Sequence, residues 1–279
     1  MAQLCLVGYT YRGYEMAYAL EQAKALGYSG IELRSFSDID LSAPAGVVAA
    51  LAKAGELAGP LGLAIHSLFY SPLPISRAQE RVDEERAFAE VMCILAEHQV
   101  PILHTRLSLQ KPDGTEVVSS GARAADYESV RRTLERLIPI AEEHRVRIAI
   151  ETHMGTIHDT AASQLAIVSA HDSGYLTGSL DFANMLIAHR EEALVETIRS
   201  FGPRIGYVHI KNVKLLPLGY DWNLPVRWGD INYYLVLKAL KEARYQGPLA
   251  VEYCGTGDPD VFAADDADYL RGLIERLGL

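Results

Sequence analysis

Four acidic or imidazole side chains follow short apolar segments in the second half of the chain. They are Glu151 (RIAIE), Asp181 (TGSLD), His209 (YVHIK) and Glu252 (PLAVE). Three carboxylates held together in a partly dry pocket repel one another and raise each other's pKa, and a divalent cation relieves that repulsion. Carboxylates with one imidazole suit Mn²⁺, Mg²⁺ or Co²⁺, and Zn²⁺ is also compatible. We therefore predict a site for one divalent metal ion, with Mn²⁺ as the preferred ion.

A site of this kind suits the movement of a proton next to a carbonyl group. A divalent cation stabilises the enediolate that forms, and a carboxylate beside the carbon acts as the base. Glu151 and Glu252 could remove a proton from one face of a ketose and return it on the other, which is epimerisation. Transfer of the proton between adjacent carbons would instead be aldose–ketose isomerisation.

The elements that must position these residues are short apolar runs that alternate with helix-periodic segments. Each run has the length and the Ile, Val and Leu content of a parallel strand covered on both faces. The runs are residues 4–8, 30–34, 63–68, 101–107, 146–151, 176–181, 205–210 and 249–252. Eight strand–helix pairs in 279 residues predict one domain, residues 1–279, folded as an α/β (β/α)8 TIM barrel. A doubly wound open sheet is the alternative, but the first turn, GYTYRGYE, lacks its GxGxxG motif.

The barrel prediction places the four side chains together. Active sites of such barrels lie at the carboxyl ends of the strands, and neighbouring strands are about 4.8 Å apart. The other interpretation is that each acid caps a helix or pairs with a loop cation. That interpretation explains one such residue better than it explains four at the ends of four consecutive strands.

Further polar residues are expected near the same rim. Because residues two apart in a strand face the same side, His153 should lie above Glu151 and Lys211 above His209. We assign them catalytic roles, His153 as a base and Lys211 as a stabiliser of developing negative charge.

Candidate substrate contacts come from other strand ends and from the long irregular stretch 211–230. His66 and Arg106 close the third and fourth runs and could bind substrate hydroxyls or a carboxylate. Trp222 could stack on a sugar or exclude water. Glu32 and Arg34 close the second run, and we take them as weaker signals.

Several segments resemble the xylose isomerase-like barrel superfamily, which includes sugar phosphate isomerases and epimerases. They are GYSGIEL, RIAIETH, TGSLDFAN, GYVHIKN, WGDINY and PLAVEY. The resemblance implies that Glu151, Asp181, His209 and Glu252 bind the metal, and that the two glutamates also act as acid and base. The 3-epimerases of this group have a histidine three residues after the Asp, where this chain has Asn184, and a substrate-binding arginine shortly after the histidine of the seventh strand, where this chain reads IKNVK. These departures argue against a 3-epimerase in the narrow sense. Asn184 is nevertheless one of our candidate substrate contacts.

Other reactions stay open. ETHMGTIHDT and HIK resemble the dehydratases of the superfamily that act on inosose and dehydroshikimate, so a metal-dependent dehydratase is the main alternative. An endonuclease IV-type apurinic endonuclease is a remote one, because three metals need more histidines than this set offers. A non-enzymatic sugar-binding barrel would not need the carboxylates.

Composition and charge limit the classes of partner that we expect for this protein. The chain has 26 basic and 36 acidic residues and a net charge of −10, which repels nucleic acid. Neither a signal peptide nor a membrane-spanning run of 18 apolar residues is evident, so we expect a cytoplasmic enzyme of carbohydrate metabolism. Its partners should be a small sugar-like substrate and, as is usual for such enzymes, further copies of itself in a homo-oligomer.

Overall fold

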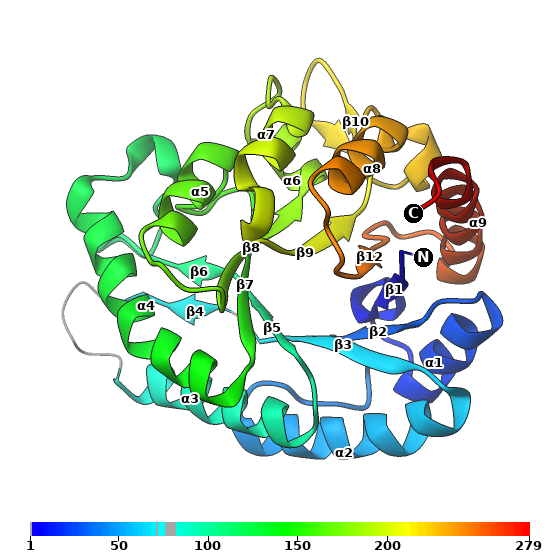
Figure 1. Ribbon diagram of the computed structural model, residues 1–279, viewed down its shortest axis with the longest axis horizontal. Coiled ribbons are helices and arrows are strands. Elements are labelled where there is room, and N and C mark those ends of the chain that lie inside the picture. The colour runs from blue at the N-terminus through cyan, green and yellow to red at the C-terminus, as the bar shows by residue number, and fades with distance from the viewer. Residues whose placement is uncertain (1, 71, 76–81) are drawn as a thin grey trace.

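The computed structural model describes residues 2–70, 72–75 and 82–279, and within them eight parallel strands close into a barrel (Figure 1). Around the barrel the strand order is β1-β12-β9-β8-β7-β5-β3-β2. The predicted (β/α)8 barrel is confirmed and the open doubly wound sheet is wrong. The barrel strands are β1 (Leu4–Val7), β2 (Gly30–Leu33), β3 (Ala64–Phe69), β5 (Ile102–Thr105), β7 (Arg147–Glu151), β8 (Leu176–Asp181), β9 (Ile205–Ile210) and β12 (Leu249–Val251).

Helices surround the barrel and bury an apolar stripe against it (Figure 1). In α4, for example, Val130, Leu134, Leu137 and Ile138 are buried, as the spacing of three and four residues predicts. The helices are α1 (Met16–Ala25), α2 (Pro44–Leu61), α3 (Val82–Glu97), α4 (Ala124–His144), α5 (Ala161–Ser169), α6 (Phe182–Ala188), α7 (Leu194–Phe201), α8 (Tyr233–Glu242) and α9 (Pro259–Leu277).

Short elements decorate the rim between strands and helices. The irregular stretch 211–230 contains the antiparallel pair β10 (Lys214–Leu215) and β11 (Tyr220–Asp221), and the 3-10 turn η4 (Val226–Trp228). A second small pair joins β4 (Leu73–Pro74) to β6 (Leu107–Ser108). The remaining 3-10 turns are η1 (Gly8–Tyr11), η2 (Ser119–Gly121) and η3 (Gly202–Arg204).

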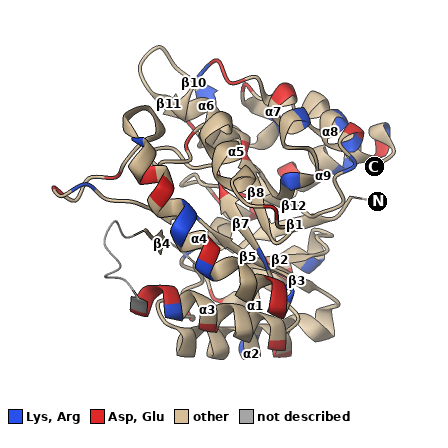
Figure 2. Cartoon of the chain, turned by 60° about the vertical axis from the view of Figure 1, so that its left-hand side comes forward, with Lys and Arg blue, Asp and Glu red and all other residues tan. Residues whose placement is uncertain are grey.

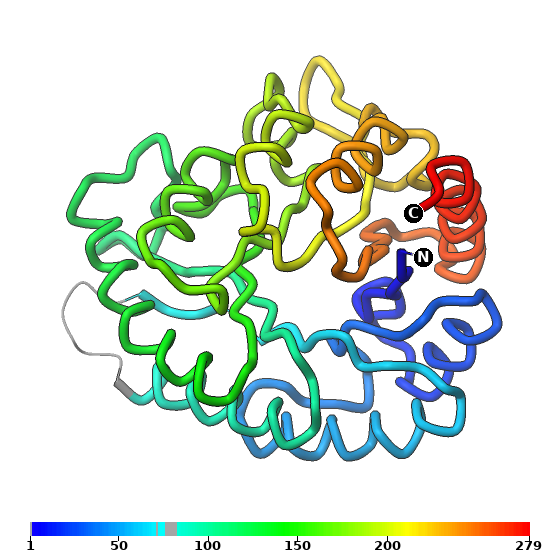
Figure 3. The backbone as a smooth tube through the Cα atoms, viewed as in Figure 1, coloured from blue at the N-terminus to red at the C-terminus, as the bar shows by residue number. Residues whose placement is uncertain are grey.

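The ring closes where the first strand meets the last. β1 pairs in parallel with both β2 and β12, and the tube in Figure 3 runs around the ring in chain order until its red end returns beside its blue start. Among the described residues, no helix combines the length and apolar character needed to cross a lipid bilayer.

Charged residues of both signs are interspersed over the outer helices. Figure 2 shows acidic and basic segments next to one another on α4, whereas the charged residues of α3 are mainly acidic. The excess of ten negative charges is therefore spread around the barrel, and the charged groups of interest are those that point inward.

Candidate metal centre

The four predicted ligands converge at the carboxyl ends of four adjacent strands. Glu151 and Asp181 end β7 and β8, His209 lies in β9, and Glu252 directly follows β12. His209 Nδ1 lies 3.3 Å from Glu151 Oε1, 3.7 Å from Glu252 Oε2 and 3.8 Å from Asp181 Oδ2. One ligand atom from each residue lies within 4.8 Å of the others, and all four side chains are buried. Consecutive parallel strands thus bring together residues that are 101 positions apart at the extremes, from 151 to 252.

The donor set fits a divalent cation. His209 Nδ1 faces the three carboxylates at 3.3–3.8 Å, and Glu151 Oε2 is a buried oxygen with no hydrogen-bond partner among the described residues. Buried polar atoms are normally paired, so an unpaired carboxylate oxygen in this cluster fits a site that takes up an ion. Glu151, Asp181, His209 and Glu252 could therefore hold one divalent cation through three carboxylates and one imidazole.

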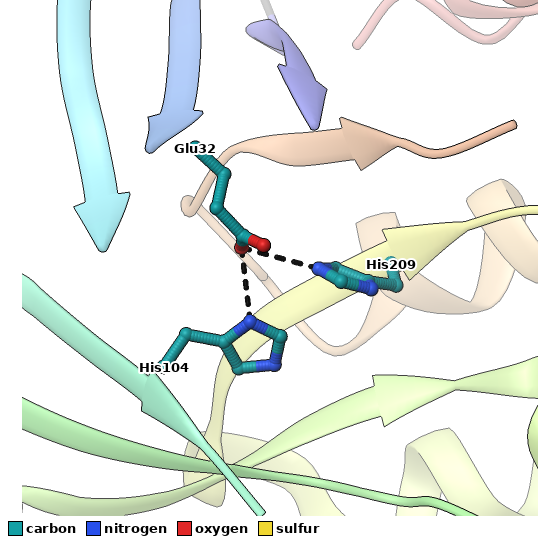
Figure 4. Close-up of side chains that lie close together, drawn as sticks. All are labelled: Glu32, His104 and His209. Atoms are coloured by element: carbon teal, nitrogen blue, oxygen red, sulfur yellow. Dashed lines mark hydrogen bonds and ion pairs between the residues drawn. The ribbon is translucent and has the colours of Figure 1, made fainter. Parts of the chain in front are cut away.

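A buried glutamate on β2 orients the imidazole of His209. Figure 4 shows the Glu32 carboxylate between the two imidazoles of His104 and His209. Glu32 Oε2 lies 2.9 Å from His104 Nδ1 and 3.2 Å from His209 Nε2, and it accepts a hydrogen bond of 3.2 Å from Ser67 Oγ. A proton on Nε2 of His209 therefore leaves the Nδ1 lone pair facing the carboxylates, as metal-ligating histidines require.

The sequence does not predict the contact between Glu32 and His209, because it indicates only that Glu32 lies near the end of a strand. Glu32, His104 and His209 come from β2, β5 and β9, which are not neighbours in the barrel, so they meet across its interior. The available signal was an acidic residue in the middle of the apolar run GIEL. Such a residue is fully buried only when it is paired.

Lys211 lies against the same carboxylates, as its spacing from His209 predicts. Its Nζ is 2.9 Å from Asp181 Oδ2 and 3.0 Å from Glu252 Oε2. The ammonium also lies 6.0 Å from the centroid of the Trp222 ring, which brings Trp222 to the rim of the site. Trp222 is half-buried, so its ring is available to a ligand at the mouth.

His153, Arg106 and Asn184 border the cluster on the side of Glu151. Arg106 Nη1 is 3.5 Å from His153 Nε2, and both side chains are half-buried. Asn184 is fully buried and donates from Nδ2 to Thr152 O at 3.1 Å and toward Glu151 Oε1 at 3.5 Å. The structure therefore places Asn184 against a candidate ligand, where it supports Glu151.

His66 requires a correction. Its Nε2 lies 3.1 Å from Ser29 Oγ, and that hydroxyl donates to the carbonyl of Leu4. Ser29 precedes β2 and Leu4 begins β1, so His66 lies at the amino end of the barrel, away from the carboxylates. The next residue, Ser67, points into the barrel toward Glu32 and Tyr207, so alternation along β3 turns His66 outward, away from the substrate.

The pKa values of the carboxylates in the site are shifted in different directions. Burial raises the pKa of Asp181 above its usual range. Burial acts in the same direction on Glu151 and Glu252. The interaction with His209 outweighs it at Glu151, and the charge of Lys211 together with His209 outweighs it at Glu252. The pKa of each glutamate is therefore held well below its ordinary value. Both glutamates are ionised at neutral pH and can serve as bases or as ligands.

The carboxylates around His209 shift the pKa of its imidazole. Burial lowers its pKa, but the charge of Glu32 and the hydrogen bonds to the surrounding carboxylates raise it well above the usual value. A cation that binds at Nδ1 therefore displaces a proton.

Comparison with protein families gives a match over most of the chain. The model described as xylose isomerase-like TIM barrel matches residues 20–273. An uncharacterized protein of Methanocaldococcus jannaschii is 32% identical over 124 residues, and the mannonate dehydratase of Oceanobacillus iheyensis is 28% identical over 180 residues. These alignments cover 43% and 55% of this chain but only 41% and 50% of the two relatives, so the chain spans about half their length.

Solved structures share the fold along nearly the whole chain. An L-ribulose 3-epimerase superposes with a TM-score of 0.77 at 17% identity, covering 99% of this chain and 96% of the other. The probable 3-DHS dehydratase of Bacillus anthracis gives 0.74 at 16% identity, covering 96% and 98%. The IOLI protein with a binding zinc atom gives 0.74 at 19% identity, covering 99% and 98%. At these identities the likeness establishes the barrel alone.

Proposed function

This chain belongs to the xylose isomerase-like TIM barrel family, and from that premise we propose that it is a divalent-metal-dependent isomerase or epimerase of a small keto-sugar or sugar phosphate. The observation that carries the proposal is the convergence of Glu151, Asp181, His209 and Glu252, whose ligand atoms lie within 4.8 Å of one another. Glu151 and Glu252 are ionised and lie on β7 and next to β12, the two outer strands of this group of four. A substrate bound between them has a carboxylate on each side.

In this reaction the residues of the site have different roles. A divalent cation, when bound, supplies positive charge that stabilises an enediolate. One of Glu151 and Glu252 removes the proton next to the carbonyl, and the other returns it to the opposite face or to the adjacent carbon. Lys211, whose Nζ is 3.0 Å from Glu252 Oε2, adds positive charge beside the developing anion, and Trp222 at the rim limits the access of water.

The metal is proposed to be Mn²⁺, with Mg²⁺, Co²⁺ and Zn²⁺ as alternatives. Three of the four ligands are carboxylates, and oxygen ligands favour Mn²⁺ and Mg²⁺ over softer ions. Among the structures that share the fold, one contains zinc and a protein of Mycobacterium smegmatis is in complex with magnesium.

A dehydratase of a cyclic keto-polyol, such as inosose or dehydroshikimate, is the second candidate. The half-buried His153 lies beside Glu151 and 3.5 Å from Arg106, so an imidazole is available as a base at the rim. An eliminase needs such a base and a stabiliser of negative charge, which Lys211 provides. The match to a mannonate dehydratase supports this candidate too.

The deciding experiment uses the protein loaded with Mn²⁺ and incubated in D₂O with ketoses, ketose phosphates, inososes and dehydroshikimate. An isomerase or epimerase gives a product of unchanged formula that carries deuterium at the carbon next to the carbonyl, seen by NMR and mass spectrometry. A dehydratase gives a product that has lost water. Exchange or conversion of none of these compounds, with the metal shown to be bound, would contradict the proposal.

A further inference from the structure

We propose that Arg34, with the cavity beside it, forms a subsite for an anionic group of the substrate, a carboxylate or a phosphate. The inference deepens the proposed function and rests on it in one respect, that the substrate reacts at the four converging ligands. It narrows the substrate class from sugars in general to acidic or phosphorylated ones.

The position of Arg34 sets how far the anionic group lies from the reacting carbons. Arg34 directly follows β2, and its Nη1 is 3.4 Å from Glu252 Oε1. The other oxygen of the same carboxylate, Oε2, is the one that faces His209 and Lys211. The guanidinium and the metal ligands thus contact opposite sides of one carboxylate. A substrate that reacts beside Glu252 needs only a few further bonds to bring an anionic group to Arg34.

The contacts of the Arg34 guanidinium leave two of its nitrogens available to a ligand. Charge-assisted bonds between a guanidinium and a carboxylate are typically about 2.7–2.9 Å long, whereas Nη1 lies 3.4 Å from Glu252 and 3.7 Å from Glu32. Both contacts use Nη1, and among the described residues no hydrogen-bond acceptor is assigned to Nε or Nη2. Those two nitrogens form the planar fork that binds a carboxylate or a phosphate through two parallel bonds.

Aromatic rings hold the fork in place. The guanidinium carbon lies 3.8 Å from the centroid of the Phe69 ring and 5.0 Å from that of Tyr9. The Arg34 side chain is only 16% exposed, so little conformational freedom remains to be lost when an anion binds. A guanidinium fixed in this way is typical of a binding site, because a flexible surface arginine would have to be ordered by its ligand.

A cavity lies against the Arg34 side chain and is large enough for part of a small substrate. Its volume is about 320 Å³, and it is lined by Arg34, Ser35, Ile39, Leu41, Ser42 and Phe69. Two hydroxyl-bearing residues in this lining suit an oxygen-rich group. Ser35 also has a φ of 59°, a left-handed conformation that costs free energy for a residue other than glycine and is found preferentially at functional sites.

The competing explanation is that Arg34 only holds Glu252 in place. In that case its replacement would weaken metal binding, because Glu252 is a candidate ligand, and would leave the affinity for anions unchanged. Binding measurements separate the two roles without any need for turnover.

The experiment is isothermal titration calorimetry of the Mg²⁺-loaded protein with D-gluconate, inorganic phosphate and the neutral D-glucitol. We expect gluconate or phosphate to bind at least tenfold more tightly than glucitol, and the preferred anion identifies a carboxylate or a phosphate subsite. Arg34→Met should lower the affinity for that anion about tenfold and change the Mg²⁺ affinity less than threefold. Lys214→Met, which removes a positive charge from the exposed β10–β11 pair, serves as the control and should behave as the wild type.

Three results would overturn the subsite. They are equal affinity of the wild type for glucitol and both anions, equal anion affinity of wild type and Arg34→Met, and a loss of Mg²⁺ affinity in Arg34→Met as large as the loss of anion affinity. If anions bind as expected but the D₂O experiment detects no reaction, the proposed reaction is wrong and the subsite stands.

Discussion

The interior of the barrel contains two layers of opposite character on the same strands. At the carboxyl end it holds the charged side chains Glu32, Glu151, Asp181, His209 and Glu252. Below them lies a neutral cluster composed of Cys5, Val7, Ile102, Ala149, Tyr207 and Ala250. β9 contributes to both, because Tyr207 and His209 are two residues apart and face the same side.

The difference between the layers shows how the barrel tolerates a buried charged site. The neutral layer has few polar groups, and its Tyr207 hydroxyl lies 2.8 Å from Ser67 Oγ, within hydrogen-bond distance. The charged layer depends instead on ion pairs and, in our proposal, on a cation. Changes in the charged layer should therefore alter binding and turnover, and changes at the amino end should alter stability alone.

Glu151→Gln should produce the largest effect, because it removes a proposed base and a proposed ligand at once. We expect turnover of the substrate identified in D₂O to fall about 10³-fold. Circular dichroism and the melting temperature should remain close to those of the wild type, since glutamine has the same shape. Glu196→Gln on the exposed surface of α7 is the control. Near-normal turnover of Glu151→Gln would show that the charged layer is not catalytic.

Glu32→Gln tests whether the charged layer extends beyond its direct ligands. Glutamine keeps the shape but removes the negative charge that holds the Nε2 proton of His209. The Kd for Mn²⁺, measured by calorimetry, should rise about 10- to 100-fold. Ser67→Ala removes another donor to Glu32 without touching His209 and should change the Kd less than threefold. Unchanged metal affinity in Glu32→Gln would restrict the role of this carboxylate to packing.

His66→Ala should produce the smallest effect, because His66 lies at the amino end. We expect the free energy of unfolding, measured with urea, to fall by about 1 kcal/mol as the contact with Ser29 is lost. Turnover and metal affinity should stay within twofold of the wild type. A large loss of turnover in this variant, with the fold intact, would mean that the two ends of the barrel are coupled.

The sequence alone predicts the features that follow from the order of strands and helices along the chain. Apolar runs locate all eight barrel strands to within a residue or two, since strands buried on both faces are almost continuously apolar. The convergence of the four ligands also follows, because they end strands that are adjacent in both the sequence and the barrel.

Contacts across the barrel are harder to anticipate. Glu32, His104 and His209 meet only because the closed ring brings β2, β5 and β9 to one axis, and no spacing in the sequence encodes that meeting. Side-chain direction matters too, because Ser67 points into the barrel and its neighbour His66 therefore lies on the outer face of β3. The pairing of two-residue strands such as β10 and β11 is set by loop geometry, which has no hydrophobic pattern.

The pairing of β1 with β12 has a consequence for biosynthesis. Leu4 pairs with Leu249, which is made 245 residues later, so the ring cannot close until every barrel strand has been synthesised. Glu252 lies just beyond that partner strand. A nascent chain therefore holds Glu151, Asp181 and His209 without the fourth ligand while residues 210–251 are made, and the full ligand set is complete only when the ring can close.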